Sequence, residues 1–466
     1  MVDFARYNPP GVYTQEIPGP QLGVSSAAAP RAVGIVGQGA GYLLDQETLT
    51  LAGTTSVALR RAGVSTSSVV VTNVNGTETY EVTTDYTVSV TTPGGAGTND
   101  DIMSITRVAS GSIPDGATVS VGYRYTDVEY FQPKVLYTYA EVVERYGPGF
   151  ISDSSGIEAR SSDVTLAAHY AILNGASRLV VVAAESSSTE DFSKALDKLN
   201  DYPDVAIIVP AASAQIVGTF TAAHVIAASG NKSERRAILG FDGTSTPVPS
   251  SERISTASSI KSDRVMVTSP DTVQIAGRNG QPVAVPGWTL AAALAGRTVS
   301  QNVAIPLTRK TLYGFLDIPG RASEAEKTQE SQNGICVVEK TLQGAIRVRH
   351  GVTTDPTSVT SREWSITGQR DEQVWRIRES LDNDGLIGSI ITDTTLINVK
   401  ATAAAALESL VMENVIRDYQ GLQVRQLVNQ PDVVEVRYEW RANAPLNYII
   451  ATFSLDLTSG TVAAQA

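Results

Sequence analysis

Leu179-Val180-Val181-Val182-Ala183-Ala184 is an unbroken apolar run in the first half of the chain. A strand with one face in water alternates apolar and polar residues, so this run predicts a strand that is buried on both faces. Residues 162–174, just before it, carry apolar residues at helical spacing. A helix followed by a doubly buried strand is the unit of parallel sheets that are covered by helices.

The same unit repeats further along the chain. Helices are predicted at 190–199, 214–230 and 250–259, strands at 205–210, 237–241 and 264–268, and a closing helix at 288–301. We therefore predict an α/β middle domain formed by residues 31–42 and 131–330. Its sheet should be mostly parallel, with helices on both sides.

The first strand of this domain, Ala32-Val33-Gly34-Ile35-Val36, is followed by Gly37, Gly39 and Gly41. The glycines resemble the start of a dinucleotide-binding turn, G-x-G-x-x-G. However, Tyr42 stands at the third glycine position and no helical pattern follows. We interpret the glycines as a flexible exit from a buried strand, without a nucleotide site.

Residues 43–130 are rich in Thr, Ser and Val and show almost no helical periodicity. Asn75-Gly76, between apolar residues at 69–71 and 79–82, is typical of a tight hairpin turn. Further short strands are predicted at 86–90, 102–108 and 119–125. This pattern indicates an all-β domain inserted into the α/β domain, and insertions of this kind lie on the outside of a scaffold.

Length and charge exclude several classes of protein. A chain of 466 residues suggests about three domains. A formal net charge of -12, without a visible basic patch, argues against a nucleic-acid partner. No apolar run approaches the length that spans a bilayer, and residues 1–10 lack the apolar region of a signal peptide. The single cysteine, Cys336, excludes an internal disulfide and is predicted in the core.

Motifs of catalytic and metal sites are missing from the sequence. The chain contains no G-x-x-x-x-G-K-[ST], no H-E-x-x-H and no G-x-S-x-G. His169, His224 and His350 are too far apart in the chain to share a helical turn. Asp382-Asn383-Asp384-Gly385 begins like a calcium loop, but Leu386 occupies the next ligand position. We expect no catalytic residue, metal or cofactor. A cytoplasmic α/β enzyme or a carbohydrate-binding protein that uses the middle domain is the alternative, on fold analogy alone.

Residues 1–30 contain two proline clusters, Pro9-Pro10-Gly11 and Pro18-Gly19-Pro20. Proline lacks the N–H that a central strand donates, so this segment is not a central strand of its own domain. We interpret it as an extended arm. Its first twenty residues could span roughly 60 Å, enough to reach a neighbouring subunit. A disordered tail is the alternative.

Residues 331–466 are predicted to form a C-terminal α+β domain. Strands at 334–340 and 345–353 are followed by a helix at 369–381 and a long amphipathic helix at 396–419. The polar face of the long helix carries Lys400, Glu408, Glu413 and Arg417. This face is either solvated or a charged contact surface.

Two terminal strands are predicted after this helix, with Pro445 in the turn between them. Apolar side chains alternate in both: Val434, Val436, Tyr438 and Trp440 in the first, and Ile449, Ala451, Phe453 and Leu455 in the second. An isolated two-stranded hairpin is marginal in water, and burying a large apolar side chain contributes roughly 1.5 to 3 kcal/mol. These apolar faces therefore need cover from another part of the assembly.

Five segments, taken in order, resemble the tail sheath proteins of contractile bacteriophage tails and related injection machines. They are Asn8-Pro9-Pro10-Gly11-Val12-Tyr13-Thr14-Gln15-Glu16, residues 127–133 with 142–147, Ile346-Arg347-Val348-Arg349, residues 375–384 and residues 433–457. No single motif is specific, and the resemblance rests on the order of all five. The inserted β domain is the variable part of such proteins.

The resemblance implies a structural role and no enzymatic activity. In sheath proteins the N-terminal arm and the C-terminal strand add to the sheets of adjacent subunits. By this analogy the α/β core carries an inserted all-β domain and a C-terminal α+β domain with exchanged terminal strands. The inter-subunit residues would be those of the two terminal strands together with Val12, Tyr13, Thr14 and Gln15. The helix at 396–419, with its four charged residues, would face an inner tube.

The resemblance also implies partners and a location. Sheath subunits stack as six-membered rings into a helical homopolymer around a tail tube protein, and they contact baseplate and tail terminator proteins. Contraction drives the tube through the cell envelope. Such proteins assemble in the host cytoplasm and form the sheath of the virion tail. Neither nucleic acid nor membrane insertion is implied.

Overall fold

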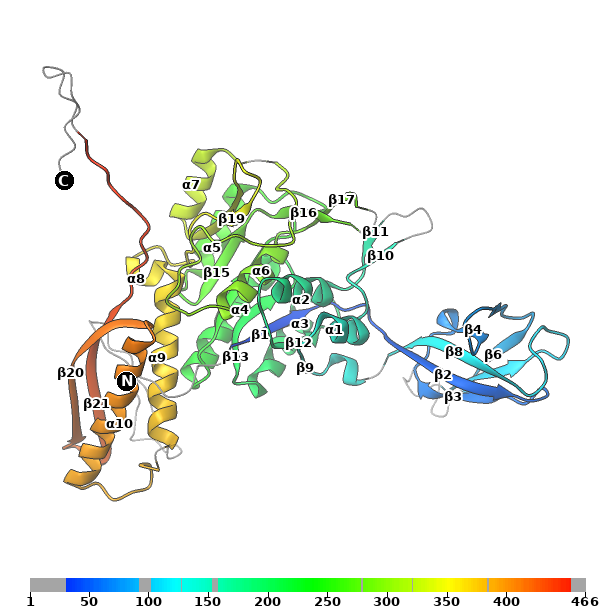
Figure 1. Ribbon diagram of the computed structural model, residues 1–466, viewed down its shortest axis with the longest axis horizontal. Helices are drawn as coiled ribbons and strands as arrows, with labels where there is room; N and C mark the ends of the chain where they lie inside the picture. Colours follow the sequence, from blue (N-terminus) through cyan, green and yellow to red (C-terminus); the bar gives the residue numbers. More distant parts are fainter. Residues whose placement is uncertain are drawn as a thin grey trace, which may run out of the picture.

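The computed structural model describes residues 31–91, 102–126, 128–152, 158–277, 280–320, 322–383 and 385–453. Three parts follow one another along its longest axis (Figure 1). A small β part lies at one end, an α/β part in the middle, and a pair of long helices with a hairpin at the other end. The predicted arm, with Val12, Tyr13, Thr14 and Gln15, lies outside the described residues, as does Leu455.

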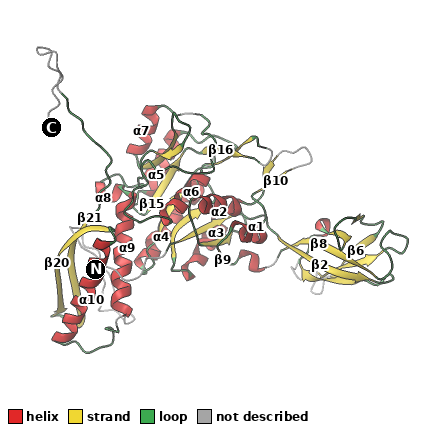
Figure 2. Cartoon of the chain, viewed as in Figure 1, coloured by secondary structure: helices red, strands yellow, loops and turns green. Residues whose placement is uncertain are grey.

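An eight-stranded sheet with the order β19-β18-β15-β14-β13-β1-β12-β9 forms the middle part (Figure 2). The six inner strands are parallel, whereas the edge strands β9 and β19 run antiparallel to their neighbours. All five residues of β12 are buried, as the apolar run predicts. The strands are β1 Ala32–Gly37, β9 Lys134–Leu136, β12 Leu179–Ala183, β13 Val205–Pro210, β14 Arg236–Leu239, β15 Val265–Ser269, β18 Ile335–Lys340 and β19 Ile346–Val348.

Helices cover both faces of this sheet. Alternate residues of each strand point to opposite faces. Val181 and Ile207 therefore join the core beneath α1, α2 and α6, while Val180 and Ile208 join the core beneath α3, α4 and α5. The helices are α1 Tyr139–Tyr146, α2 Asp163–Leu173, α3 Thr189–Asp197, α4 Ala214–Gly230, α5 Ser250–Ile260 and α6 Trp288–Val299.

Seven strands from one segment form the small β part at the right of Figure 1. Four make a sheet with the order β2-β8-β4-β5 and three make a sheet with the order β3-β7-β6; in the described ranges they pair only with one another. The predicted hairpin at Asn75-Gly76 is present, with β4 paired to β5 and Gly76 at a φ of 69°. The strands are β2 Leu43–Leu51, β3 Val57–Ala62, β4 Val70–Asn73, β5 Thr79–Tyr80, β6 Tyr86–Thr91, β7 Ile102–Arg107 and β8 Ala117–Tyr125.

Gly39 lies where the chain leaves the sheet for the inserted part. A Cβ at this position would come within 2.0 Å of the Tyr130 hydroxyl, so the site requires glycine. The N–H of Gly41 donates a hydrogen bond of 2.9 Å to the same hydroxyl, and burial raises the pKa of Tyr130 to about 12. Leu43 also pairs with Tyr125. The outgoing and returning chains are thus held side by side, and the predicted flexible exit is wrong.

The remaining part consists of two long helices, α9 and α10, and the hairpin β20–β21, shown at the left of Figure 1. Side chains of all four elements share one apolar cluster. Their bounds are α9 Trp364–Asn383, α10 Asp393–Met412, β20 Ile416–Leu427 and β21 Gln430–Ala442. Smaller elements are β10 Phe150–Ser152, β11 Glu158–Arg160, β16 Thr272–Ala276, β17 Pro282–Pro286, α7 Glu324–Gln332, α8 Val359–Arg362 and the short turns Thr66–Ser68, Val128–Phe131 and Lys198–Asp201.

Two predicted boundaries and one predicted strand pairing differ from this structure. The boundary between residues 330 and 331 would separate β18 and β19 from the sheet to which they belong. The helix predicted at 396–419 ends at Met412, because Asn414 adopts a φ of 56° and β20 begins at Ile416. The predicted pairing of 433–440 with 447–457 is also wrong. Residues 430–442 pair with 416–427, and residues 447–453 contain no strand.

Candidate assembly surface

The hairpin β20–β21 covers the helices α9 and α10 with one of its faces. Val434, Val436, Tyr438 and Trp440 pack against a cluster that includes Leu407 of α10. The alternation predicted for this strand is therefore confirmed, but its cover comes from helices of the same protomer. Charged residues occupy the other face, where the pairs Arg425–Glu435 and Arg441–Asp418 lie at 2.7 and 3.1 Å.

Both long edges of this hairpin lack a strand partner in the part of the chain that the structure describes. β20 contains twelve residues and β21 thirteen. Outer edges of this length present unpaired N–H and C=O groups, to which a further strand can add. The hairpin thus offers two acceptor edges on a supported sheet.

The chain leaves this hairpin at Asn443, which is held by Gln369 of α9. The Gln369 side-chain N–H donates to the Asn443 carbonyl at 3.0 Å, and the Asn443 N–H donates to the Gln369 side-chain oxygen at 2.8 Å. Gln369 is 0% exposed. Four residues later, the Asn447 amide donates to the Glu363 carboxylate at 3.1 Å. These contacts fix the direction in which the chain departs.

Beyond this clamp the chain exposes apolar side chains without forming a helix or a strand as far as Phe453. Leu446, Tyr448, Ile449, Ile450 and Phe453 are between 74% and 91% exposed. Ala451 is exposed as well. A continuous exposed apolar segment of this kind marks a contact surface.

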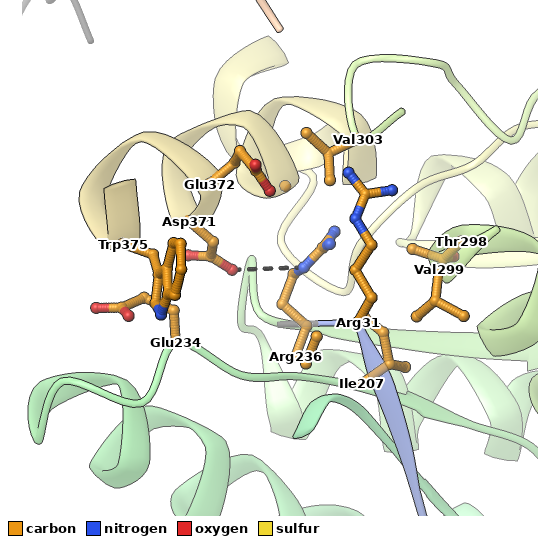
Figure 3. Close-up of a pocket in the computed structure, with 12 residues that line it drawn as sticks. Arg31, Ile207, Glu234, Arg236, Thr298, Val299, Val303, Asp371, Glu372 and Trp375 are labelled. Carbon is orange, nitrogen blue, oxygen red and sulfur yellow. Dashed lines mark ion pairs between the residues drawn. The ribbon is translucent and has the colours of Figure 1, made fainter. Parts of the chain in front are cut away.

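Buried ion pairs attach α9 to the sheet. Asp371 of α9 pairs with Arg236 at 3.4 Å and with Arg264 at 2.8 Å, and Arg378 of α9 pairs with Glu234. Figure 3 shows Arg236 and Asp371 facing each other in a cavity of about 40 Å³ that Arg31 also lines. Burial lowers the pKa of Arg236 to about 10, so its guanidinium stays charged at neutral pH. Separating these charges would leave them unpaired in the interior, which opposes movement of α9 away from the sheet.

The helix α10 buries one face and exposes another. Ile397 and Met412 are 66% and 75% exposed, although Leu407 and Leu410 are buried. Among the described residues, α10 is the one helix long and apolar enough to cross a membrane by length and composition, with 28% of that window buried. From the sequence, no apolar run of this length was predicted. A helix packed in the core of a protein passes the same test.

The four charged residues predicted on this helix lie in different places. Lys400 and Glu408 are exposed on α10. Glu413 follows the last helical residue, and its carboxylate accepts a hydrogen bond of 2.8 Å from Arg376 of α9. Arg417 lies in β20. The predicted charged face is therefore reduced to Lys400 and Glu408, because the helix ends sooner than its apolar spacing indicates.

Three functional candidates were not predicted from the sequence: Gln369, Glu363 and Asp371. Polar residues on a helix are usually interpreted as its solvent face, but here Asp371 is 9% exposed and Gln373 2%. The available signal was the run Gln369-Arg370-Asp371-Glu372-Gln373, which gives polar residues to every face of α9. Polar groups that a helix buries must pair with a partner.

The three histidines and the cysteine of the described residues lie in buried or hydrogen-bonded surroundings. No group of three or more potential metal ligands is found in the described ranges. Burial lowers the pKa of His169, and burial together with Arg235 lowers that of His224. The His350 ring lies 3.0 Å from Glu363. Cys336 is fully buried, which raises its pKa to about 12 and makes its thiolate scarce.

Comparison with known proteins decides the family. Residues 185–354 match the family described as phage tail sheath protein central domain. A tail sheath protein of Mycobacterium phage Bxz1 is 44% identical over 414 residues, which cover 87% of this chain and 71% of the relative. The chain belongs to the tail sheath protein family. The tail sheath protein of Bacillus phage SP01 is 25% identical over 256 residues, covering 53% of this chain and 42% of that relative.

Solved sheath structures share the fold of this tail sheath protein. The helical sheath of the anti-feeding prophage in its contracted state gives a TM-score of 0.57 at 12% identity, covering 97% of this chain and 100% of that chain. The contracted sheath complex of an extracellular contractile injection system, PVC, gives 0.56 at 12% identity, covering 97% and 99%. At such identities the likeness concerns the fold. The family match ends at residue 354, shortly after β19, the last strand of the eight-stranded sheet along the chain.

Proposed function

We propose that this tail sheath protein polymerises by exchanging strands with neighbouring copies. The observation that carries the proposal is the hairpin β20–β21, which has two strand edges without partners in the described chain and lies beside the clamped, exposed segment at 443–453. Two edges accept two strands. The C-terminal segment of one neighbour would add to one edge, and the N-terminal arm of another, with Val12, Tyr13, Thr14 and Gln15, to the other.

Exchange would cover the surface that a single copy leaves exposed. Five large apolar side chains between Leu446 and Phe453 are mostly in water. Burial of each contributes about 1.5–3 kcal/mol, before the entropy of ordering the segment is subtracted. Pairing the edges with specific strands also prevents non-specific edge-to-edge aggregation.

Strand exchange of this kind is heterologous, and heterologous contacts that do not close a ring give open helical assemblies. We propose stacked six-membered rings around a tail tube protein, with Ile397, Lys400, Glu408 and Met412 of α10 facing the tube. Contraction would move each subunit largely as a rigid body, which the buried ion pairs of α9 support. The ends of the polymer would contact baseplate and tail terminator proteins. Similarity to a structure from the anti-feeding prophage baseplate, with a TM-score of 0.56 at 14% identity, supports the baseplate contact. Assembly would take place in the host cytoplasm.

Truncation after Ala442 tests the strand exchange. We expect a folded, soluble protein with an unchanged circular dichroism spectrum that forms no tubes in negative-stain electron microscopy. Deletion of residues 1–20 should give the same result, because the second edge then lacks its strand. Normal tubes from either variant would contradict the proposal. Closed small oligomers of the full chain would instead favour the alternative of an enzyme or carbohydrate-binding protein.

A further inference from the structure

A second surface of this protein carries a groove that lies apart from the two free edges of the hairpin β20–β21. The groove has a volume of about 1130 Å³ and lies between α7, the strands β18 and β19, and residues 308–320. Ser269 at the end of β15 lines it, so it opens at the carboxyl end of the parallel strands, where α/β sheets place their binding sites. Asn447 and Tyr448, which belong to the departing C-terminal segment, form part of its wall.

Positive charge prevails in this groove, although the chain as a whole has a net charge of -12. Its lining contains seven Lys and Arg side chains and four Asp and Glu side chains. At the centre, Glu339 is shared by four cations: Arg347 at 2.8 Å, Arg349 at 3.3 Å, Lys327 at 3.8 Å and Arg309 at 3.9 Å. Glu324 serves two of the same four, Lys327 and Arg349, each at 2.7 Å. Within the described residues, two carboxylates therefore face four cations in this cluster, which leaves an excess of positive charge.

Among the four cations of this cluster, Arg309 has the longest ion pair to a carboxylate. Its side chain is 63% exposed, and within the described part of the chain it forms only the long ion pair to Glu339. Its backbone is fixed in the left-handed region, at a φ of 64°, while its N–H donates to the carbonyl of Val348 at 2.9 Å in the edge strand β19. The side chain is thus presented at the groove from a defined position on the sheet.

We infer that this groove binds an acidic surface segment of a second copy of the chain. This inference rests on the proposed polymerisation. The remainder of an acidic protein provides carboxylates in excess, and a basic groove on the same protein is complementary to them. The groove exceeds the volume of about 300–1,000 Å³ that is usual for small-molecule sites, and polar side chains dominate its wall. Its position beside Asn447 means that the neighbour which receives the C-terminal segment also comes near the groove.

Charge reversal at Arg309 provides the first arm of the test. Arg309→Glu should raise the protein concentration needed for tube formation at least about tenfold, since close interfacial charge pairs contribute at least this much. Glutamate tolerates the left-handed backbone no worse than arginine does, so the fold is retained. Arg309→Lys should stay within about twofold of the wild type. The control Lys261→Glu reverses an exposed charge at the end of α5, outside the groove lining, and should also stay within about twofold.

The second arm of the test is zero-length cross-linking of tubes that contain a mixture of isotope-labelled copies. A carbodiimide joins lysine amines to carboxylates that touch them, and tubes grown from ¹⁴N and ¹⁵N copies distinguish links between copies from links within one. We expect Lys327 and Lys340 to give mixed-isotope links, which identify the acidic segment. Links confined to their own partners, Glu324 and Asp317, together with normal polymerisation of Arg309→Glu, would overturn the groove assignment alone. Failure of the wild type to form any tubes would overturn the strand exchange and the groove assignment together.

Discussion

The side-chain amide of Gln369 forms hydrogen bonds with both the N–H and the C=O of Asn443, as the backbone of a neighbouring strand would. Gln369→Leu would leave these two groups unpaired, which costs about 1–3 kcal/mol locally. We expect the fold to persist and the segment from 443 onward to exchange its amide hydrogens faster. Hydrogen exchange with mass spectrometry measures the effect on peptides that cover residues 440–453.

Gln373→Leu is the matched control for this prediction. Gln373 lies one turn further along α9 and is 2% exposed, and its side-chain oxygen accepts no hydrogen bond from the residues that the structure describes. Leucine at this position should leave exchange at Asn443 unchanged. Equal exchange in the two variants would show that Gln369 does not hold the departing chain.

Asp163, the first residue of α2, makes stability depend on pH. Burial raises its pKa from 3.8 to about 6, against the effect of Arg160 at 2.9 Å. The folded state therefore binds this proton more tightly than the unfolded chain does. The resulting stabilisation is complete below about pH 4 and is lost as the pH rises through 6, a change of about 3 kcal/mol.

Asp163→Asn tests this assignment, since the amide does not titrate. Urea unfolding of both proteins at pH 4.5 and pH 7 measures the change in the free energy of unfolding. We expect the wild type to lose more stability than the variant over this interval. An identical change in both would mean that Asp163 titrates normally.

At the scale of elements, the attachment of α9 to the sheet depends on Asp371, which forms ion pairs with both Arg236 and Arg264 in the interior. Asp371→Ala would leave a buried guanidinium unpaired, and we expect a loss of about 3–5 kcal/mol in the free energy of unfolding. Asp418→Ala, which removes the exposed partner of Arg441, should cost no more than about 1 kcal/mol. Comparable losses in urea unfolding would contradict the view that the α9 pairs fix this helix to the sheet.

The elements of the middle part could be predicted because their signals are local. The apolar run at 179–184 and the helical spacing at 162–174 each lie within one element. The end of α10 was misplaced because Ile416 and Tyr419 continue its apolar spacing into β20. The hairpin was assigned to the wrong partner since strand pairing does not follow from the alternation of one strand. The contact between Gln369 and Asn443 could not be predicted, because the two residues lie 74 positions apart in the chain.

At the scale of the whole molecule, the inserted β part and the hairpin β20–β21 lie at opposite ends (Figure 1). Replacing residues 43–126 by a short Gly-Ser linker should leave the core folded, because Leu43 and Tyr125 are paired neighbours. We expect this variant to form tubes, which electron microscopy would show with a smaller outer diameter. A folded variant that forms none would place an essential contact on the inserted part.

The extent of the sheet could not be predicted from chain order. β18 pairs with β15, but the chain runs from Ser269 to Ile335 between them, through β16, β17, α6 and α7. A strand that returns after so long an excursion looks like the start of a new domain. The edge strand β9, with three residues, is too short to carry a sequence signal. β19 lies within the strand predicted at 345–353, but its place in this sheet was not predicted.

The start and the exit of the described chain meet on the same helix. Arg31 shares the cavity of Figure 3 with Gly368 and Asp371 of α9, and Asn443 is held by Gln369, within the same turn. Arg31 is followed directly by β1, and α9 is held to the sheet by the pairs of Asp371 with Arg236 and Arg264. Tension applied to both ends would therefore pass from β1 through the sheet and these ion pairs into α9. The inserted part lies outside this path and would carry none of the load.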